Sequence, residues 1–281
     1  MESTLITRLA TLSHPNRMAV FRLLMRRCPD DLPAGEIAKA LTLKASTASV
    51  YLSALTQAGL IKQRREGTRL LYGVNLDAAR EVVADLFLDC CRGRADLCPP
   101  QFSGLLQGIA PVAGPRFTVL FICTGNSARS IMAETILRDR AGARFTALSA
   151  GTAPRSEVHP LAVETLKAQG HDVTPLRAKT LAEFQTPEAP NMDFVFTVCD
   201  RAANEDCPAW SGAPVSGHWG IADPAGATGT EAQRRQAFQQ AYDALYAHIT
   251  AFTALPLDDL DRRSLQHHVD RIAKFNAQED H

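Results

Sequence analysis

Hydrophobic residues in the first 90 positions recur mostly at helical spacing, with one change to strand spacing. Pro15 is well placed to begin a helix, and Gly59 is the residue type expected just after the end of one. Two β-prone runs flank Glu66-Gly67, which is a hairpin signal. The expected elements are helices around 5–12, over 15–27, 34–41 and 46–58, a hairpin over 60–74, and a last helix from about 77 to 90.

The pattern changes in the second half of the chain. Residues 117–122 form an unbroken apolar run of strand length, followed by a loop and a helical stretch over 130–140. Residues 194–198 form a second such run, and the tail over 257–275 has the spacing of an amphipathic helix. Unbroken apolar strands are typical of a parallel sheet covered by helices. The segment 99–115, rich in Pro and Gly, is typical of a linker.

Length and charge fit this division. A chain of 281 residues is long for one core, so we expect a mainly α domain over 1–98, the linker over 99–115, and an α/β domain over 116–281. The first 98 residues carry 14 Lys and Arg against 10 Asp and Glu, and the rest carry 16 against 20, giving +4 and −4. The basic front favours an anionic partner such as nucleic acid.

The chain shows no signal peptide and no apolar run near the ~20 residues of a membrane span. We therefore expect a cytoplasmic protein without a membrane partner. In that reducing compartment its 7 cysteines are better interpreted as metal ligands or redox groups than as disulfides.

A short loop follows the first apolar strand and opens a helix. It begins at Cys123, reaches Arg129 six positions later, and is followed by Ser130. Backbone N–H groups and a helix N-terminus around one point bind a tetrahedral oxyanion and should lower the pKa of Cys123, making it a thiolate near neutral pH. Arg129 can fork onto two anion oxygens, and Ser130 can donate to the sulfur. The anion-binding residues are Thr124, Gly125, Asn126, Ser127 and Ala128. A buried structural cysteine beside a surface arginine is the alternative.

Three segments around this loop carry a family resemblance. Residues 119–137, Ser149-Ala150-Gly151-Thr152 and Asp223-Pro224 resemble the low-molecular-weight protein tyrosine phosphatase fold, over about 116–256. The resemblance implies that Cys123 is a nucleophile, that Arg129 clamps the anion, and that Asp223 is a general acid on the leaving oxygen.

Further residues resemble one branch of that fold. The segment 218–225, His-Trp-Gly-Ile-Ala-Asp-Pro-Ala, is similar to arsenate reductases. Cys199, expected at the end of the second strand, and Cys207 supply two more thiols, separated by one residue more than in thioredoxin-coupled members. The resemblance implies reduction of arsenate to arsenite, with Cys199 and Cys207 relaying a disulfide outward to thioredoxin, the favoured donor, or to glutathione or mycothiol. Two idle core cysteines are the alternative. No organic cofactor is expected. A potassium ion near Asn126, Glu134 and Ser149 and simple hydrogen bonding there are both open.

The N-terminal region has its own resemblance. Residues 46–55, with Gly59-Leu60, resemble the recognition helix of ArsR-type winged helix-turn-helix repressors, over residues 5–90. This implies operator DNA as a partner and a homodimer formed through the first and last helices of the region. The residues expected at DNA are Ser46, Thr47, Ser49 and Tyr51 on the helix and Arg64, Arg65 and Arg69 on the hairpin. A solvated charged hairpin is the alternative for the arginines.

Three of the nine residues 90–98 are cysteines: Cys90, Cys91 and Cys98. Trivalent arsenic prefers three soft thiolates, so this cluster is a candidate arsenite site, with arsenite as the effector that releases DNA. Adjacent cysteines cannot face one way on a regular helix, so the helix must fray or the site must be shared with a dimer partner. Incidental thiols are the alternative.

Together these observations favour a bifunctional arsenic-resistance protein, an arsenite-responsive repressor fused to an arsenate reductase. A low-molecular-weight tyrosine phosphatase fused to a soft-metal-responsive repressor is the alternative, and a pure regulator with an idle anion-binding domain is a third hypothesis.

Overall fold

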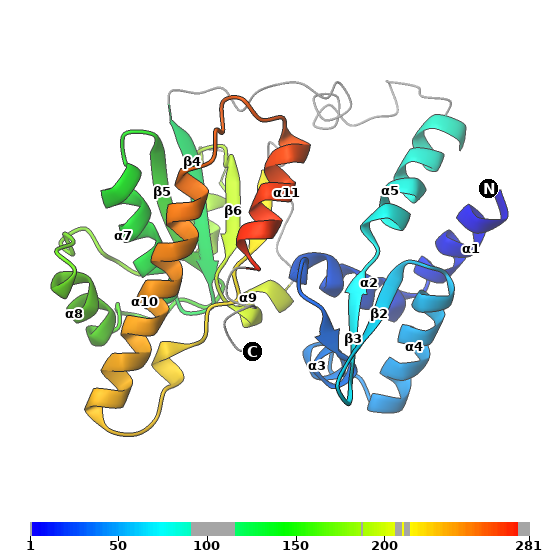
Figure 1. Ribbon diagram of the computed structural model, residues 1–281, viewed down its shortest axis with the longest axis horizontal. Coiled ribbons are helices and arrows are strands. Elements are labelled where there is room, and N and C mark those ends of the chain that lie inside the picture. Colours follow the sequence, from blue (N-terminus) through cyan, green and yellow to red (C-terminus); the bar gives the residue numbers. More distant parts are fainter. Residues whose placement is uncertain (1, 91–115, 187, 206–209, 211–213, 275–281) are drawn as a thin grey trace. The chain divides into compact units, whose positions relative to one another are not determined.

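The computed structural model describes residues 2–90, 116–186, 188–205, 210 and 214–274. Contacts within the chain divide it into two compact units, Met1–Ser103 and Gly104–His281 (Figure 1). The expected linker over 99–115 lies outside the described residues. Among the helices of the described part, none is long and apolar enough to cross a membrane.

The N-terminal unit packs its helices around a small antiparallel sheet with strand order β1-β3-β2. Its elements are α1 (Glu2–Leu12), α2 (Pro15–Arg27), β1 (Leu32–Pro33), α3 (Ala34–Ala40), α4 (Ala45–Gln57), β2 (Ile61–Glu66), β3 (Arg69–Val74) and α5 (Leu76–Ala84), which continues as a π-helical stretch, Asp85–Cys90. The expected helices and hairpin are confirmed. Strand β1 was not predicted, because two residues are too short to show a period.

The end of α4 shows how local residues shape this unit. Gly59 has φ of +71°, a conformation that glycine adopts without steric cost. Leu60 N–H then donates back to Leu55 O at 3.0 Å, which closes the helix and turns the chain into β2. The apolar faces of the helices meet in a core that includes Val20, Leu23, Leu24, Ile37, Leu52, Leu55 and Leu60. The hydrophobic spacing thus places α4 with one face buried and the other exposed.

The C-terminal unit is built on a sheet with strand order β5-β4-β6-β7, in which all neighbours run parallel. Its strands are β4 (Phe117–Cys123), β5 (Phe145–Gly151), β6 (Phe194–Thr197) and β7 (Val215–His218). Its helices are α7 (Arg129–Ala141), α8 (Pro160–Ala168), α9 (Asp200–Asn204), α10 (Glu231–Thr253) and α11 (Arg262–Ile272). Short 3-10 turns span Leu181–Phe184 and Pro224–Gly226. The predicted parallel α/β fold is confirmed.

Several elements of this unit were not predicted. They are β5, β7, α8, α9 and α10, and the closing helix α11 begins at Arg262, several residues after the expected start. Because the strands are parallel, their carboxyl ends meet at one edge of the sheet. Cys123, Gly151, Thr197 and His218 are the last residues of the four strands, so the chemistry of this unit gathers there.

Candidate functional site: an anion loop and a second thiol

The loop between β4 and α7 lies at the carboxyl edge of the sheet. Ala128 precedes α7, and its methyl side chain cannot accept a hydrogen bond. The first N–H groups of α7 therefore have no side-chain acceptor at that position. Gly151 borders the loop so closely that a Cβ there would lie 2.7 Å from Thr124 O. The result is a tight turn of backbone around a helix N-terminus, the geometry that binds an oxyanion.

The Cys123 sulfur lies at the base of this loop and is buried. Its Sγ is 2.9 Å from Ser130 Oγ and accepts the Asn126 N–H at 3.2 Å. Burial raises the pKa of the Cys123 thiol, and it outweighs the lowering by the Ser130 hydroxyl and by the charge of Arg129. The direction of this pKa shift in the loop without an anion is opposite to the expected lowering, because desolvation of the sulfur is its largest cause.

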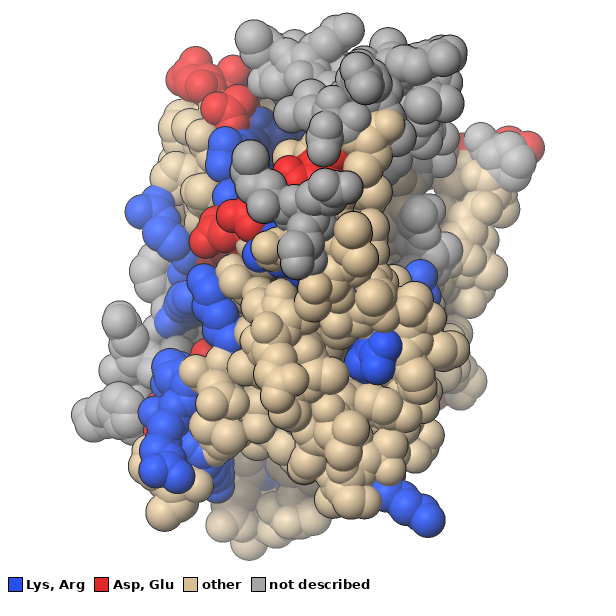
Figure 2. All heavy atoms as spheres, turned by 90° about the vertical axis from the view of Figure 1, so that its right-hand side faces the viewer, with Lys and Arg blue, Asp and Glu red and all other residues tan. Residues whose placement is uncertain are grey.

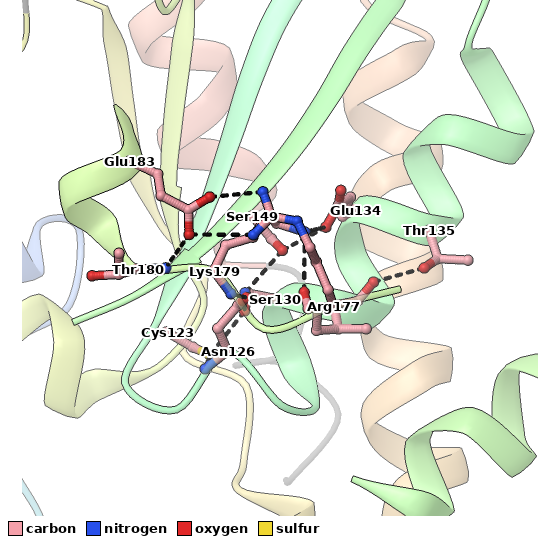
Figure 3. Close-up of polar contacts among 11 residues, drawn as sticks. Cys123, Asn126, Ser130, Glu134, Thr135, Ser149, Arg177, Lys179, Thr180 and Glu183 are labelled. Carbon is pink, nitrogen blue, oxygen red and sulfur yellow. Dashed lines mark hydrogen bonds and ion pairs between the residues drawn. The ribbon is translucent and has the colours of Figure 1, made fainter. Parts of the chain in front are cut away.

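Asn126 holds the loop together from its centre. It has φ of +40°, an uncommon conformation for a residue other than glycine, and it is fully buried. Its amide compensates for that strain: Nδ2 donates to Ser130 Oγ and to Ser149 Oγ, each at 2.8 Å, and Oδ1 accepts Lys179 N–H at 2.6 Å (Figure 3). Ser130 Oγ accepts from Asn126 and keeps its own proton available for a hydrogen bond with Cys123 Sγ.

A largely buried ion pair lies beyond Asn126, where the sequence left a potassium ion and simple hydrogen bonding both open. Ser149 Oγ donates to Glu134 Oε2 at 2.5 Å, and the Lys179 ammonium lies 2.7 Å from the same oxygen (Figure 3). Lys179 therefore already supplies a positive charge at Glu134. The side chains in this arrangement do not fit a potassium ion at that oxygen. The potassium site stays a prediction. Among the described residues, no group of three or more His, Cys, Asp or Glu could hold a metal ion.

Arg129 and Asp223 meet across the mouth of the loop. Arg129 Nη1 donates to Ile221 O at 3.0 Å, and its Nη2 lies 3.1 Å from Asp223 Oδ1. Asp223 also caps the turn that begins at Pro224, with Oδ1 accepting Ala225 N–H. The fold thus brings together the predicted nucleophile, the anion clamp and the acid, although they are about 100 residues apart at most in the sequence.

Cys199 is the second thiol at this edge. It caps α9, its Sγ accepting Ala202 N–H at 3.4 Å, and it is buried. Its Sγ lies 3.6 Å from the hydroxyl of Thr124, the residue next to Cys123. Strand β6 ends at Thr197, two residues before Cys199, so Cys199 belongs to the start of a helix and not to the end of the strand as expected. Cys207 lies outside the described residues.

In the N-terminal unit, the predicted DNA-contacting side chains lie mostly on exposed surface. Ser46 and Ser49 are exposed on α4, and Thr47 is half-buried. Tyr51 is half-buried, because its ring packs on His14 at 5.0 Å and its hydroxyl accepts from Asn16 Nδ2 at 3.3 Å. Figure 2 looks onto this unit and shows Lys and Arg gathered along one edge of a largely uncharged surface.

The three hairpin arginines are not equivalent. Arg64 pairs with Asp31 at 3.1 Å and with Glu66 at 3.5 Å. Arg65 and Arg69 are exposed, and neither forms an ion pair within the part of the chain that the structure describes. Arg65 lies opposite Leu70 in the hairpin, and Arg69 lies opposite Glu66. Because side chains alternate along a strand, Arg65 points to the face opposite to Arg64 and Arg69.

Of the predicted arsenite ligands, Cys90 is exposed and ends the π-helical stretch after α5. Cys91 and Cys98 lie outside the described residues.

Some residues at the anion loop were not predicted. Arg155 N–H donates to Gly125 O at 2.9 Å, and His159 N–H donates to Ser127 O at 2.8 Å, so the segment after β5 borders the loop along its length. Lys179 and His218 are buried polar residues at the same edge. A lone Lys in a polar loop carries no sequence signal for burial, because most lysines are exposed.

The comparisons identify the class of protein that this fold and site define. Residues 118–266 match the family described as low molecular weight phosphotyrosine protein phosphatase, and residues 12–64 match a helix-turn-helix domain. The first match spans more than half of the chain, so the chain belongs to the low molecular weight phosphatase family.

Within that family the chain belongs with the arsenate reductases. The arsenate reductase of Bacillus licheniformis is 34% identical over 136 residues, which cover 48% of this chain and 94% of that protein. With the helix-turn-helix match, this confirms the expected fusion of an ArsR-like winged helix-turn-helix unit with a domain of arsenate reductase type.

Two solved structures are similar to parts of the chain. An arsenate reductase in the phosphate binding state is 22% identical, with a TM-score of 0.39, over 48% of this chain and 97% of that chain. A homodimeric winged helix-turn-helix DNA-binding domain from Mycobacterium bovis is 32% identical, with a TM-score of 0.26, over 31% of this chain and 84% of that chain.

Proposed function

We propose that the C-terminal unit reduces arsenate to arsenite with Cys123 as nucleophile and Cys199 as the thiol that completes the reduction. The observation that carries this proposal is the 3.6 Å distance between Cys199 Sγ and the hydroxyl of Thr124. Thr124 is the residue after Cys123, so a second thiol contacts the direct neighbour of the nucleophile. Relatives that match over nearly their whole length carry the name arsenate reductase. A hydrolytic phosphatase has no need of that second thiol.

In the first step the Cys123 sulfur attacks arsenic in an arsenate held by the loop and Arg129. A sulfur–arsenic bond forms, and an arsenate oxygen leaves as water. That oxygen needs protons, and the Cys123 thiol gives up its own proton as its sulfur bonds to arsenic, where an arsenate oxygen can accept it. Asp223, 3.1 Å from Arg129, is the side chain placed to pass a proton to the leaving oxygen.

In the second step the Cys199 thiol loses its proton to solvent and attacks Cys123 Sγ. A sulfur–sulfur bond forms and the sulfur–arsenic bond breaks, leaving its electron pair on arsenic, which is thereby reduced from the pentavalent to the trivalent state. The Cys207 thiolate then attacks Cys199 Sγ, so that a Cys199–Cys207 bond forms, the Cys123–Cys199 bond breaks and Cys123 leaves as a thiolate. An external dithiol or thiol then reduces the Cys199–Cys207 disulfide. Thioredoxin is the donor we favour, with glutathione or mycothiol as alternatives.

Arsenate-dependent NADPH oxidation in the presence of thioredoxin and its reductase tests this function. We expect turnover by the full chain, loss of turnover in Cys199→Ser, and normal turnover in Cys28→Ser, a matched control in the other unit. Parallel assays with glutathione plus glutaredoxin and with mycothiol identify the donor. Absence of turnover with all three donors contradicts the proposal.

We further propose that the N-terminal unit binds operator DNA as a homodimer and releases it when arsenite binds Cys90, Cys91 and Cys98. Support for DNA binding comes from the exposed hydroxyls of α4 and from Arg65 and Arg69, which form no ion pair among the described residues. A gel-shift titration tests the sensor: arsenite should release DNA from the full chain but not from a Cys90→Ser variant. Undiminished DNA binding in excess arsenite contradicts the sensor role.

A phosphatase fused to a soft-metal repressor remains the second candidate, because Cys123, Arg129 and Asp223 would serve phosphate esters equally well. Hydrolysis of p-nitrophenyl phosphate separates the two functions. A phosphatase keeps its multiple-turnover activity in Cys199→Ser and Cys207→Ser. A reductase forms no arsenite in Cys199→Ser and stops after one turnover in Cys207→Ser.

A further inference from the structure

Thr197 and Asp200, which lie on either side of Cys199 in the sequence, belong to different elements. Thr197 is the last residue of β6, and Asp200 is the first residue of α9. The position of Cys199 between them is therefore set by how firmly α9 is held to the end of β6. Attack on a sulfur requires the incoming thiol to be aligned with the bond that breaks, so small displacements of Cys199 are costly to the rate.

His218 joins these two flanking residues. It is the last residue of β7, opposite Thr197 in the sheet, and its side chain is wholly buried. Its Nδ1 lies 2.8 Å from Thr197 Oγ1, and its Nε2 lies 3.2 Å from Asp200 Oδ1. Both ring nitrogens are thus engaged, one on each side of Cys199.

The proposed thiol relay does not use this imidazole, although it lies beside the second thiol. A buried histidine with both nitrogens engaged in hydrogen bonds is rigid, and rigid neighbours hold a reacting group in place. We propose that His218, through Thr197 and Asp200, is a positioning residue that holds Cys199 in line for attack on Cys123. The inference rests on the proposed thiol relay and names the residues that set its geometry.

The test uses the full chain with two substitutions, made one at a time. Asp200→Ala removes the exposed partner of His218 Nε2, and His218→Gln removes the imidazole that joins Thr197 to Asp200. Asp200→Asn keeps an acceptor oxygen for Nε2 and should rescue. His248→Gln is the matched control, because His248 is also buried and packs on Trp219, but it bonds to Ala244 O within α10.

Two rates are measured for the Cys123–Cys199 disulfide by rapid alkylation and peptide mass analysis, one after arsenate addition and one after oxidation by diamide. All chains carry Cys207→Ser, so that the disulfide is not passed on. Protection of Cys123 from iodoacetamide by inorganic phosphate, a tetrahedral oxyanion that is not reduced, reports anion binding. In Asp200→Ala and His218→Gln we expect both disulfide rates to fall about tenfold or more, with phosphate protection unchanged. Asp200→Asn and His248→Gln should stay within about twofold of the parent chain, a small fraction of that positioning effect.

Parent-like diamide rates in Asp200→Ala and His218→Gln overturn the proposal, as does a parent chain whose two thiols fail to join under diamide. A fall equal to that of His248→Gln also overturns it, because general destabilisation then explains the effect. Disulfide formation with diamide but not with arsenate, still dependent on Asp200 and His218, supports the positioning role and contradicts the proposed reductase function instead.

Discussion

The anion loop of the C-terminal unit and the DNA-facing surface of the N-terminal unit differ in how their residues are held. Around the loop, each functional side chain contacts another: Cys123 with Ser130, Ser130 with Asn126, and Arg129 with Asp223. On α4 and the hairpin the candidate residues are mostly exposed, and Tyr51 and Arg64 contact residues outside the set. In the buried site, contacts within the protein fix the positions of the functional side chains. On the exposed surface, those positions are fixed only when the partner binds.

The largest effect expected from this comparison is in the buried site. Cys199→Ser should reduce multiple-turnover arsenate reduction by at least about 100-fold, because the second thiol supplies the electron pair that no neighbour replaces. Steady-state NADPH oxidation measures this. Activity within tenfold of the parent chain would show that another thiol completes the reduction.

A second prediction compares a buried ion pair with an exposed one. Lys179→Met leaves the largely buried Glu134 carboxylate without its ammonium, and should lower the free energy of unfolding of the C-terminal unit by about 2–3 kcal/mol. Arg177→Met is the control, because the Arg177–Glu183 pair is exposed and such pairs contribute under about 1 kcal/mol. Urea denaturation measures both; equal losses would contradict the importance we assign to burial.

A third prediction concerns pH. Because the pKa of Cys123 is raised, its thiolate fraction at neutral pH is lower than that of an ordinary cysteine, and alkylation by iodoacetamide should keep increasing above the pH at which a free thiol levels off. Ser130→Ala removes a group that lowers the pKa, so its profile should move to still higher pH.

Thr135→Ala is the matched control for that profile. Thr135 is a buried hydroxyl on the same helix, but it donates to Ile131 O within α7. Its profile should coincide with that of the parent chain. A Cys123 profile centred below that of a free thiol would contradict the conclusion that burial dominates the pKa of this sulfur.

The smallest effect is expected on the exposed surface. Arg65→Ala should weaken DNA binding and reduce the salt dependence of binding by about one unit of slope, as expected for one lost phosphate contact. Arg64→Ala should change it less, because Asp31 and Glu66 already hold that side chain. Fluorescence anisotropy at several salt concentrations measures both, and the reverse order would show that the ion pairs of Arg64 break on binding.

The sequence predicted those parts of the fold whose signal is local. Gly59 marked the end of α4, Pro15 the start of α2, and unbroken apolar strands the parallel sheet. Strands β5 and β7 carried no comparable run, since β5 ends in small residues at Ser149 and Gly151 and β7 contains Gly217. Their places are fixed by pairing with β4 and β6, which is a property of the tertiary structure.

The site divides in the same way. Cys123, Arg129 and Ser130 share one short loop and could be predicted together, and the family resemblance added Asp223 and Cys199. The pKa of Cys123 could not be predicted, because it depends on how completely the fold removes water from the sulfur. Lys179 and His218 gain their roles from burial beside partners distant in the sequence, Glu134 and Thr197, and no spacing rule reveals such pairs.

The central claim is that Cys123 and Cys199 together supply the two electrons that reduce arsenate. A single-turnover experiment without any external donor tests it most directly, with arsenite quantified by chromatographic speciation and free thiols counted in the same quenched sample. We predict about one arsenite per chain and the loss of two thiols per chain, with both products absent in Cys199→Ser. Arsenate bound without arsenite formed, or arsenite formed while Cys123 and Cys199 remain reduced, would contradict the claim.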